Sequence, residues 1–495
     1  MGQAFDVVVI GGGINGAAVC HDLTRAGYRV MLVEQGDFGG GTSQASTMLI
    51  WGGLLYLKDL EFATVRALTR DRDRLVAERP GSVQARQLLY VPTPGSRSRV
   101  LVQGALYAYW LMGQTSRLLP RRLGDFAEQA LLRHRDAAAY AFEEAALVTS
   151  DARFVLEWIL EAERMGAVTR NYARVEAADA AGAAGWRLGL CDAVTGVTSE
   201  VSARLVVNAA GCWTDAVNAC AGVGTPFRHA FSRGVSLAVA RDPRHRRHLV
   251  FDNGIDGNAM TFAPWGPVAL WGSTDTLHPR FDDARRATMH DVEFLLHELN
   301  RHVSTPVGHD DVVSLRTGVR PVPVAHDAPL PAGTGGLTRH HRVHLDARSP
   351  WVSIYGGKLS GCVGLAAEVR ALVGRRLAPS IAPAAAPRAA TTPGLVRFPT
   401  LADAVVAPAW AATHEHCRWL DDYLRRRTNI AQWVPRGGLG VHDEHASELL
   451  RIATAIHDGD TGRARRDLDS YAAAVGEGWG LVGGAAVVPA AEHAP

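Results

Sequence analysis

Residues 5–34, FDVVVIGGGINGAAVCHDLTRAGYRVMLVE, decide the fold class. The stretch opens with an apolar, β-branched run over residues 5–10, which is typical of a strand buried on both faces. A glycine-rich turn follows at once and leads into a helical pattern. A second apolar run, residues 28–33, predicts another strand and is followed by the acid Glu34. This order is that of a βαβ unit, so the sequence predicts an α/β protein.

The glycines of this turn fit the pattern G-x-G-x-x-G at Gly11, Gly13 and Gly16. Such glycines allow the sharp bend, let backbone N–H groups approach a pyrophosphate and let the helix pack against the strand. Glu34 is then placed to accept hydrogen bonds from ribose hydroxyls, which favours FAD or NAD over NADP. The alternative is a glycine-rich turn that binds no ligand.

Four later segments carry a resemblance to a known family. They are GTSQASTMLIWGGLLYLKDLEF (41–62), LVVNAAGCW (205–213), DDVVSLRTGVRP (310–321) and SIYGGKL (353–359). With them the chain resembles the FAD-dependent glycerol-3-phosphate dehydrogenases, within the larger group of D-amino-acid-oxidase-like flavoenzymes. The resemblance implies an enzyme with FAD as cofactor, in which a hydride passes from a substrate carbon to flavin N5.

The glycine motif and the resemblance together assign the FAD contacts to several separate segments. The expected cofactor-binding residues are Gly11, Gly13, Ile14, Asn15, Gly16, Glu34, Thr42, Ser43, Ser46, Gly211, Trp213, Gly357, Lys358 and Leu359. No metal site is expected, because the six cysteines show no paired spacing.

FAD-type motifs alternate with strand-rich segments along the chain. We therefore expect a Rossmann-type, glutathione-reductase-like FAD domain interleaved with a mixed-sheet substrate domain over residues 1–375. An Ala/Pro-rich stretch predicts a linker at 376–395, helical patterns predict a C-terminal helical domain at 396–480, and residues 481–495 are expected to form a flexible tail. Residues 154–165 and 288–302 are expected to be helical.

Two cationic residues are the candidate catalytic residues. The resemblance places Arg320 and Lys358 at the family's anion-binding arginine and lysine. Arg can grip a carboxylate or phosphate with two parallel hydrogen bonds, whereas Lys supplies a point charge. The chain contains only two lysines, Lys58 and Lys358, so the retention of Lys358 favours a function. The alternatives are an ion pair for Arg320 and an ordinary surface charge for Lys358.

One wall of the expected substrate site departs from the family. Where the family carries Lys, His and Arg, this chain has Met48, Trp51 and Leu55, while Tyr56 is retained. The expected substrate-binding residues are thus Met48, Trp51, Leu55, Tyr56, Arg320 and Lys358. Losing two cations weakens the grip on a phosphate dianion, and losing the histidine removes a proton acceptor for alcohol oxidation.

These changes favour a repurposed pocket that binds a small anionic amine, amino acid or hydroxy compound. Two alternatives stay open: a genuine FAD-dependent glycerol-3-phosphate dehydrogenase, and an FAD-binding paralogue without catalysis. The electron acceptor, whether oxygen, quinone or a carrier, is also open.

Composition excludes several other classes of function. The formal net charge is only +2, so no nucleic-acid partner is expected. No apolar run reaches the length of a membrane span, and we expect a cytoplasmic protein with at most peripheral membrane contact. Residues 100–112 (VLVQGALYAYWLM) are expected to form a buried helix, with a membrane-surface helix as the alternative. A homodimer is left open.

Overall fold

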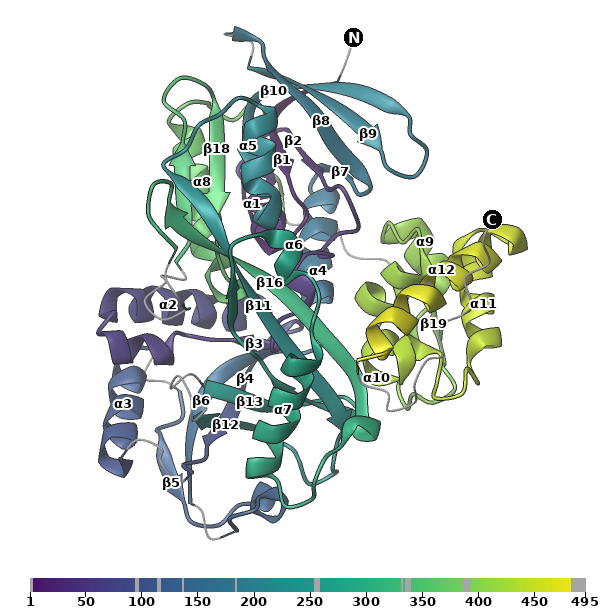
Figure 1. Ribbon diagram of the computed structural model, residues 1–495. Coiled ribbons are helices and arrows are strands. Elements are labelled where there is room, and N and C mark those ends of the chain that lie inside the picture. The colour runs from purple at the N-terminus through teal and green to yellow at the C-terminus, as the bar shows by residue number, and fades with distance from the viewer. Residues whose placement is uncertain are drawn as a thin grey trace.

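The computed structural model describes residues 3–93, 98–113, 117–135, 138–182, 185–252, 259–330, 333, 340–385 and 392–481. It contains two large sheets, with a separate group of helices at the C-terminal end (Figure 1). The predicted α/β class, with an FAD-type domain, a mixed-sheet domain and a helical C-terminal region, is confirmed.

The first sheet is the predicted βαβ sheet. Its path runs β17 (Arg342–Leu345), β18 (Trp351–Tyr355), β10 (Thr198–Asn208), β1 (Gln3–Ile10), β2 (Val30–Val33) and β7 (Val168–Arg170), and the hairpin β8 (Ala173–Ala180) and β9 (Trp186–Asp192) pairs with β10. The strands β18, β10, β1, β2 and β7 are mutually parallel.

Both faces of β1 are buried, which explains its unbroken apolar run. Val7 and Val9 pack into a core shared with α1 (Ile14–Arg25), α4 (Asp151–Arg164) and α8 (Cys362–Gly374). Val8 and Ile10 point the other way, into a core with β8, β9 and α5 (Thr214–Cys220). Alternation along one strand therefore fills two cores.

The second sheet has ten strands and follows the order β15, β11, β14, β13, β12, β4, β6, β3, with β16 beside β11 and β5 beside β6. The bounds are β3 (Leu49–Ile50), β4 (Val83–Tyr90), β5 (Arg121–Leu123), β6 (Ala139–Leu147), β11 (Phe227–Ala240), β12 (His248–Asp252), β13 (Ala259–Trp265), β14 (Val268–Gly272), β15 (Thr276–His278) and β16 (Val312–Ala325). The sheet is mixed, because β12 pairs parallel to β4 and the other pairs are antiparallel. The chain crosses between the two sheets repeatedly, as the interleaved motifs predict.

Helices flank these sheets. The predicted helix at 288–302 is α7 (Met289–His302), which packs on the second sheet, and α6 (Phe281–Ala284) precedes it. The helices α2 (Phe62–Glu78) and α3 (Arg99–Met112) lie at one edge (Figure 1). The expectation that residues 100–112 are buried is wrong for one face of α3, because Val100 is 84% exposed and Leu111 66%. Among the described residues, no helix combines the length and apolarity needed to cross a bilayer.

The C-terminal region has its own apolar core. Its elements are β19 (Leu395–Val396), β20 (Val405–Val406), α9 (Pro408–His414), the π-helical turn η8 (Asp422–Arg427), α10 (Ile430–Trp433), α11 (Ala446–Ile456) and α12 (Thr461–Trp479). Of the expected linker, residues 380–384 lie against the first domain, where Ile381 N donates to Gly27 O at 3.1 Å. The expected flexible tail falls, after Leu481, outside the described residues.

Candidate functional site

A cavity of about 820 Å³ lies between the two sheets and is the candidate cofactor and substrate site. That volume falls within the range of roughly 300–1,000 Å³ that ligand pockets typically have. Of the predicted site residues that the structure fully describes, all but Gly16 and Met48 line it. The lining ones are Gly11, Gly13, Ile14, Asn15, Glu34, Thr42, Ser43, Ser46, Trp51, Tyr56, Gly211, Trp213, Arg320, Gly357, Lys358 and Leu359.

The glycine turn brings the start of α1 to the cavity. A Cβ on Gly16 would lie only 1.9 Å from Gly11 O, so only glycine permits this approach between helix and turn. Gly16 does not line the cavity and acts through this packing. Ser43 Oγ accepts a hydrogen bond from Ile14 N at 3.0 Å. The partly positive N-terminus of α1 therefore faces the space where a pyrophosphate is expected.

Glu34 directly follows β2 and lies beside the glycine turn. Its two carboxylate oxygens accept hydrogen bonds from Gly12 N at 2.7 Å and from Gly36 N at 2.8 Å. Burial raises the pKa of Glu34, whereas these two backbone bonds oppose the rise. The carboxylate is held in place by the backbone and lines the cavity, as its expected role toward a ribose requires.

The turn that contains Thr42, Ser43 and Ser46 is held by a buried ion pair. Arg316 Nη2 lies 2.8 Å from Asp151 Oδ2, and the same oxygen accepts from Ser46 N at 2.7 Å. Arg316 Nη2 also donates to Gln44 O at 2.7 Å. Neither Asp151 nor Arg316 is among the residues expected from the sequence, although Arg316 lies in the segment 310–321 that carries the resemblance.

The late glycine pair meets the first glycine turn across the cavity. Asn15 Nδ2 donates to Gly356 O at 2.8 Å, and a Cβ on Gly357 would lie 2.6 Å from Asn15 Nδ2. Asn15 Oδ1 is buried and has no hydrogen-bond partner among the described residues. A buried acceptor that faces a cavity without a partner fits a bound group that carries donors.

Lys358 follows this glycine pair, is half-buried and lines the cavity. Its Nζ lies 4.1 Å from the centre of the Tyr56 ring and donates a hydrogen bond to the Tyr56 hydroxyl. Burial lowers the pKa of Lys358 to about 7, because the charged ammonium loses its water. Lys358 thus lies in the cavity wall in contact with Tyr56.

Arg320 projects from β16 into another part of the wall and remains 30% exposed. Its Nη2 donates to Ser273 Oγ at 2.6 Å, and its Nη1 lies 3.4 Å from Asp275 Oδ1. The alternative of an ion pair for Arg320 is thus realised, but the guanidinium still lines the cavity. Asp275 holds the guanidinium in place while part of it stays accessible.

Only some of the residues that differ from the family line the cavity as the sequence predicts. Trp51 lines the cavity and is joined by Leu54, which sequence reasoning missed. Met48 does not line it: the side chain is 3% exposed and packs in the main core. Leu55 belongs to the turn η2 (Leu54–Asp59), and its side chain lies outside the described part of the structure. Of the two changed side chains that the structure describes, Trp51 faces the cavity and Met48 does not.

The fold and this cavity define a class of protein. A family model described as FAD dependent oxidoreductase matches residues 6–347. The chain belongs to this family. The glycine cradle, the helix N-terminus and the unpartnered Asn15 Oδ1 fit FAD, which supplies the redox chemistry when bound.

Within this family the chain is similar to glycerol-3-phosphate dehydrogenases. It is 30% identical to glycerol-3-phosphate dehydrogenase 2 of Mycobacterium bovis over 399 residues, which cover 77% of this chain and 65% of the relative. It is 31% identical to the probable mitochondrial glycerol-3-phosphate dehydrogenase of Caenorhabditis elegans, covering 72% of this chain and 51% of that protein. The chain thus spans about two thirds or less of the length of these relatives.

Solved structures show the same fold. The glycerol-3-phosphate dehydrogenase of Bacillus halodurans complexed with FAD matches with a TM-score of 0.69 and 20% identity, over 97% of this chain and 95% of that chain. Glycine oxidase of Geobacillus kaustophilus matches with a TM-score of 0.53 and 22% identity, over 79% of this chain and all of that chain. The fold thus occurs in proteins named for alcohol and for amine oxidation, and the wall residues must decide the substrate.

Proposed function

We propose that this flavoenzyme oxidises a small monoanionic molecule, an amine, amino acid or hydroxy compound, in a repurposed glycerol-3-phosphate dehydrogenase pocket. The observation that carries the proposal is the cavity wall, where Arg320 and Lys358 are present and Trp51 occupies the position at which the family resemblance implies a histidine. Two cations suit a carboxylate, whereas a phosphate dianion usually collects more donors. Trp51 has no basic atom to take a hydroxyl proton, and a neutral amine requires no such acceptor.

The alternative function is glycerol-3-phosphate oxidation, which the names of the relatives favour. The two are separated by anaerobic flavin bleaching with matched compounds: amino acids, amines, 2-hydroxy acids and glycerol 3-phosphate. We expect a carboxylate-bearing amine to bleach the flavin faster than glycerol 3-phosphate. Turnover of several per second at sub-millimolar glycerol 3-phosphate, within the ordinary range of enzymes, would contradict the proposal.

A substitution back toward the family gives a matched comparison. Trp51→His restores the proton acceptor in the cavity wall and leaves Arg320 and Lys358 in place. We expect this variant to gain activity toward glycerol 3-phosphate and to lose activity toward the amine substrate. A variant with no gain toward any alcohol would count against the role assigned to Trp51.

We propose that Arg320 and Lys358 hold the anionic group of the substrate. Truncating one partner of a buried charge pair costs about 2–5 kcal/mol, more than the loss of a rim charge. Arg320→Ala and Lys358→Ala should each raise the substrate concentration that half-saturates flavin reduction by more than about tenfold, with FAD still bound. The double variant should fall short of the sum, because both residues share one ligand. An Arg320→Ala enzyme with unchanged substrate affinity would overturn this assignment.

We further infer that α3 makes peripheral contact with an anionic membrane surface. Val100, Leu101 and Leu111 are 84%, 59% and 66% exposed on this helix. Exposed arginines lie at its start and in β5, at Arg99, Arg121 and Arg122, and the described residues from 98 to 123 include no acid. Apolar side chains flanked by cations are the pattern of an interfacial helix.

Vesicle flotation tests this contact. We expect binding to vesicles that contain phosphatidylserine, loss of binding in Leu101→Ser/Leu111→Ser, and weak binding to neutral phosphatidylcholine. Equal flotation of the wild type and the double variant would exclude α3 as the contact.

A further inference from the structure

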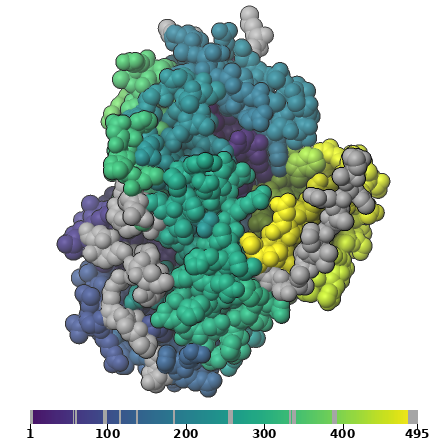
Figure 2. Space-filling view, viewed as in Figure 1, coloured from purple at the N-terminus to yellow at the C-terminus, as the bar shows by residue number. Residues whose placement is uncertain are grey.

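The C-terminal helical region enters the wall of the FAD cavity. Asp421, directly before η8, and Arg426, within it, line the cavity together with Glu34 and Tyr172. In Figure 2 the purple N-terminal part of the chain is visible deep between the teal upper part and the yellow C-terminal helices. The region that the sequence predicts as a separate domain is therefore part of the cofactor site.

Arg426 bridges two segments of the cofactor cradle. Its Nε donates to Asp37 Oδ2 at 2.5 Å, in the loop that follows β2 and Glu34. Its Nη1 donates to Gln44 Oε1 at 3.0 Å, in the turn that holds Ser43 against α1. Its Nη2 donates to Asp422 Oδ1 at 2.7 Å within η8. Both Asp37 and Gln44 line the cavity.

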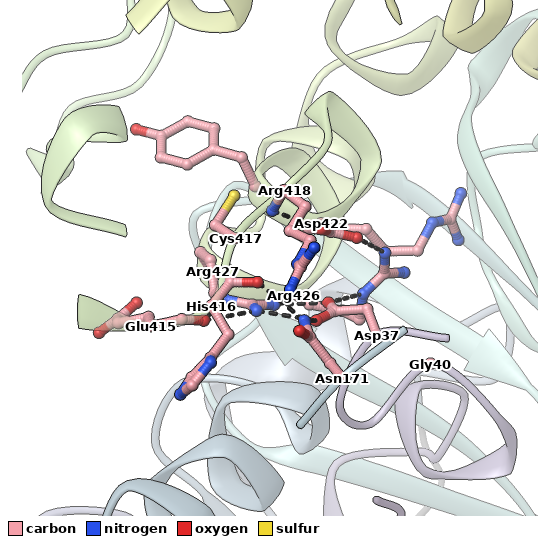
Figure 3. Close-up of polar contacts among 12 residues, drawn as sticks. Asp37, Gly40, Asn171, Glu415, His416, Cys417, Arg418, Asp422, Arg426 and Arg427 are labelled. Carbon is pink, nitrogen blue, oxygen red and sulfur yellow. Dashed lines mark hydrogen bonds and ion pairs between the residues drawn. The ribbon is translucent and has the colours of Figure 1, made fainter. Parts of the chain in front are cut away.

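Arg427 shares the same acid but has no part in the cavity wall. Its Nη1 and Nη2 donate to the two oxygens of Asp37 at 2.5 and 2.8 Å, and it also donates to Glu415 O. Figure 3 shows both arginines reaching Asp37 from the C-terminal region, with Asn171 on the other side. The side chains of Arg426 and Arg427 are only 6% and 0% exposed.

A network of this kind contributes little to stability relative to an apolar core. Burying charges costs several kcal/mol per ion before pairing offsets it, and apolar residues of similar volume are often as stable. What such a network supplies is a single defined geometry, because each fork-shaped guanidinium accepts few arrangements of its acids. Arg426 thereby fixes the position of the Asp37 loop relative to the Gln44 turn, and both segments line the cavity.

We propose that Arg426 is a cofactor-positioning residue: it clamps the Asp37 loop and the Gln44 turn, so that FAD retention depends on the C-terminal helical region. The dependence of FAD affinity on Arg426 is independent of which substrate the enzyme oxidises. Arg427 anchors the same region to Asp37 without reaching the cavity, so it serves as the matched control.

The experiment compares Arg426→Lys and Arg427→Lys, each of which keeps the charge and removes the fork. For each apoprotein, FAD affinity is measured by flavin fluorescence titration, and thermal stability is measured without FAD. We expect Arg426→Lys to raise the dissociation constant for FAD by at least about tenfold. Arg427→Lys should lower the apoprotein melting temperature at least as much but leave FAD affinity within about threefold of wild type.

Two outcomes would overturn the proposal. One is wild-type FAD affinity in Arg426→Lys. The other is an equal loss of FAD affinity in both variants, which would show a general structural role of the cluster.

A second variant covers the case in which Arg426→Lys fails to fold. Gln44→Leu removes the contact between Arg426 and the turn without leaving a buried charge, and Gln44 lies on the first domain. We expect weaker FAD binding in Gln44→Leu, and an effect in the double variant with Arg426→Lys smaller than the sum of the two, because both act through one hydrogen bond. Strict additivity, or unchanged FAD affinity in Gln44→Leu, would contradict the clamp.

Discussion

Lys358 combines a position directly after a glycine pair with an unusual environment. Its ammonium packs against the Tyr56 ring, and desolvation lowers its pKa to about 7. Below that pH the free enzyme carries a cation in the cavity, and above it the amine is neutral. The charge available to hold an anion therefore falls as the pH rises through neutrality.

From this we predict a pH-dependent substrate affinity. Above about pH 7 the apparent dissociation constant for the anionic substrate should rise by about tenfold per pH unit, because the anion binds the protonated amine and that form becomes scarce. Lys358→Arg, whose side chain stays charged, should flatten the profile. The measurement is the substrate dependence of flavin reduction by stopped flow between pH 6 and 9. Affinity that improves with rising pH would instead point to Lys358 as a proton acceptor.

At the scale of elements, the contact between the glycine turn and the first turn of α1 determines where the helix begins relative to the cavity. The two approach so closely that any side chain at Gly16 meets the carbonyl of Gly11. The position of the α1 N-terminus at the cavity therefore depends on the absence of a side chain at Gly16. The Ser43 hydroxyl supports this position by accepting a hydrogen bond from Ile14 N.

We predict that Gly16→Ala destabilises the apoprotein by about 1–3 kcal/mol, because the helix must move away from the turn, and that it also weakens FAD binding. Gly81→Ala is the matched control, since a Cβ there meets nothing within 4 Å. That control should stay within about 0.5 kcal/mol of wild type. Both quantities can be read from urea unfolding and flavin fluorescence. Equal stability of the two variants would show that the turn tolerates a side chain.

At the scale of the whole molecule, long side chains tie the two sheets and the C-terminal region around one cavity. Arg316 reaches from β16 in the second sheet to Asp151 at the start of α4 in the first domain, and both are buried. Arg426 and Arg427 make the corresponding connection from the C-terminal region to Asp37.

We predict that Arg316→Met destabilises the protein by about 3–5 kcal/mol, because it leaves Asp151 buried without its cation. Arg316→Met/Asp151→Asn should recover part of this loss, since the second substitution removes the uncompensated charge. Urea unfolding of the apoproteins, followed by tryptophan fluorescence, measures both effects. A double variant less stable than Arg316→Met would argue against an ion pair as the source of the loss.

Local sequence was sufficient for the βαβ unit, the order of the motifs and most of the cofactor cradle. These features rest on short-range physics: alternation along a strand, helical periodicity, and glycines that a close backbone approach requires. The placement of Arg320 and Lys358 in the cavity wall also followed from motifs: Arg320 lies within β16, and Lys358 follows the glycine pair after β18.

Tertiary structure decided which side chains of the altered segment face the cavity, and which distant segment completes its wall. Met48 and Trp51 are three positions apart in one altered segment, yet one packs in the core and the other lines the cavity. Arg426 meets Asp37 across 389 positions of sequence. No local pattern encodes such a pairing, because the orientation of a side chain in an irregular segment and the docking of a distant helical region depend on the packing of the whole chain.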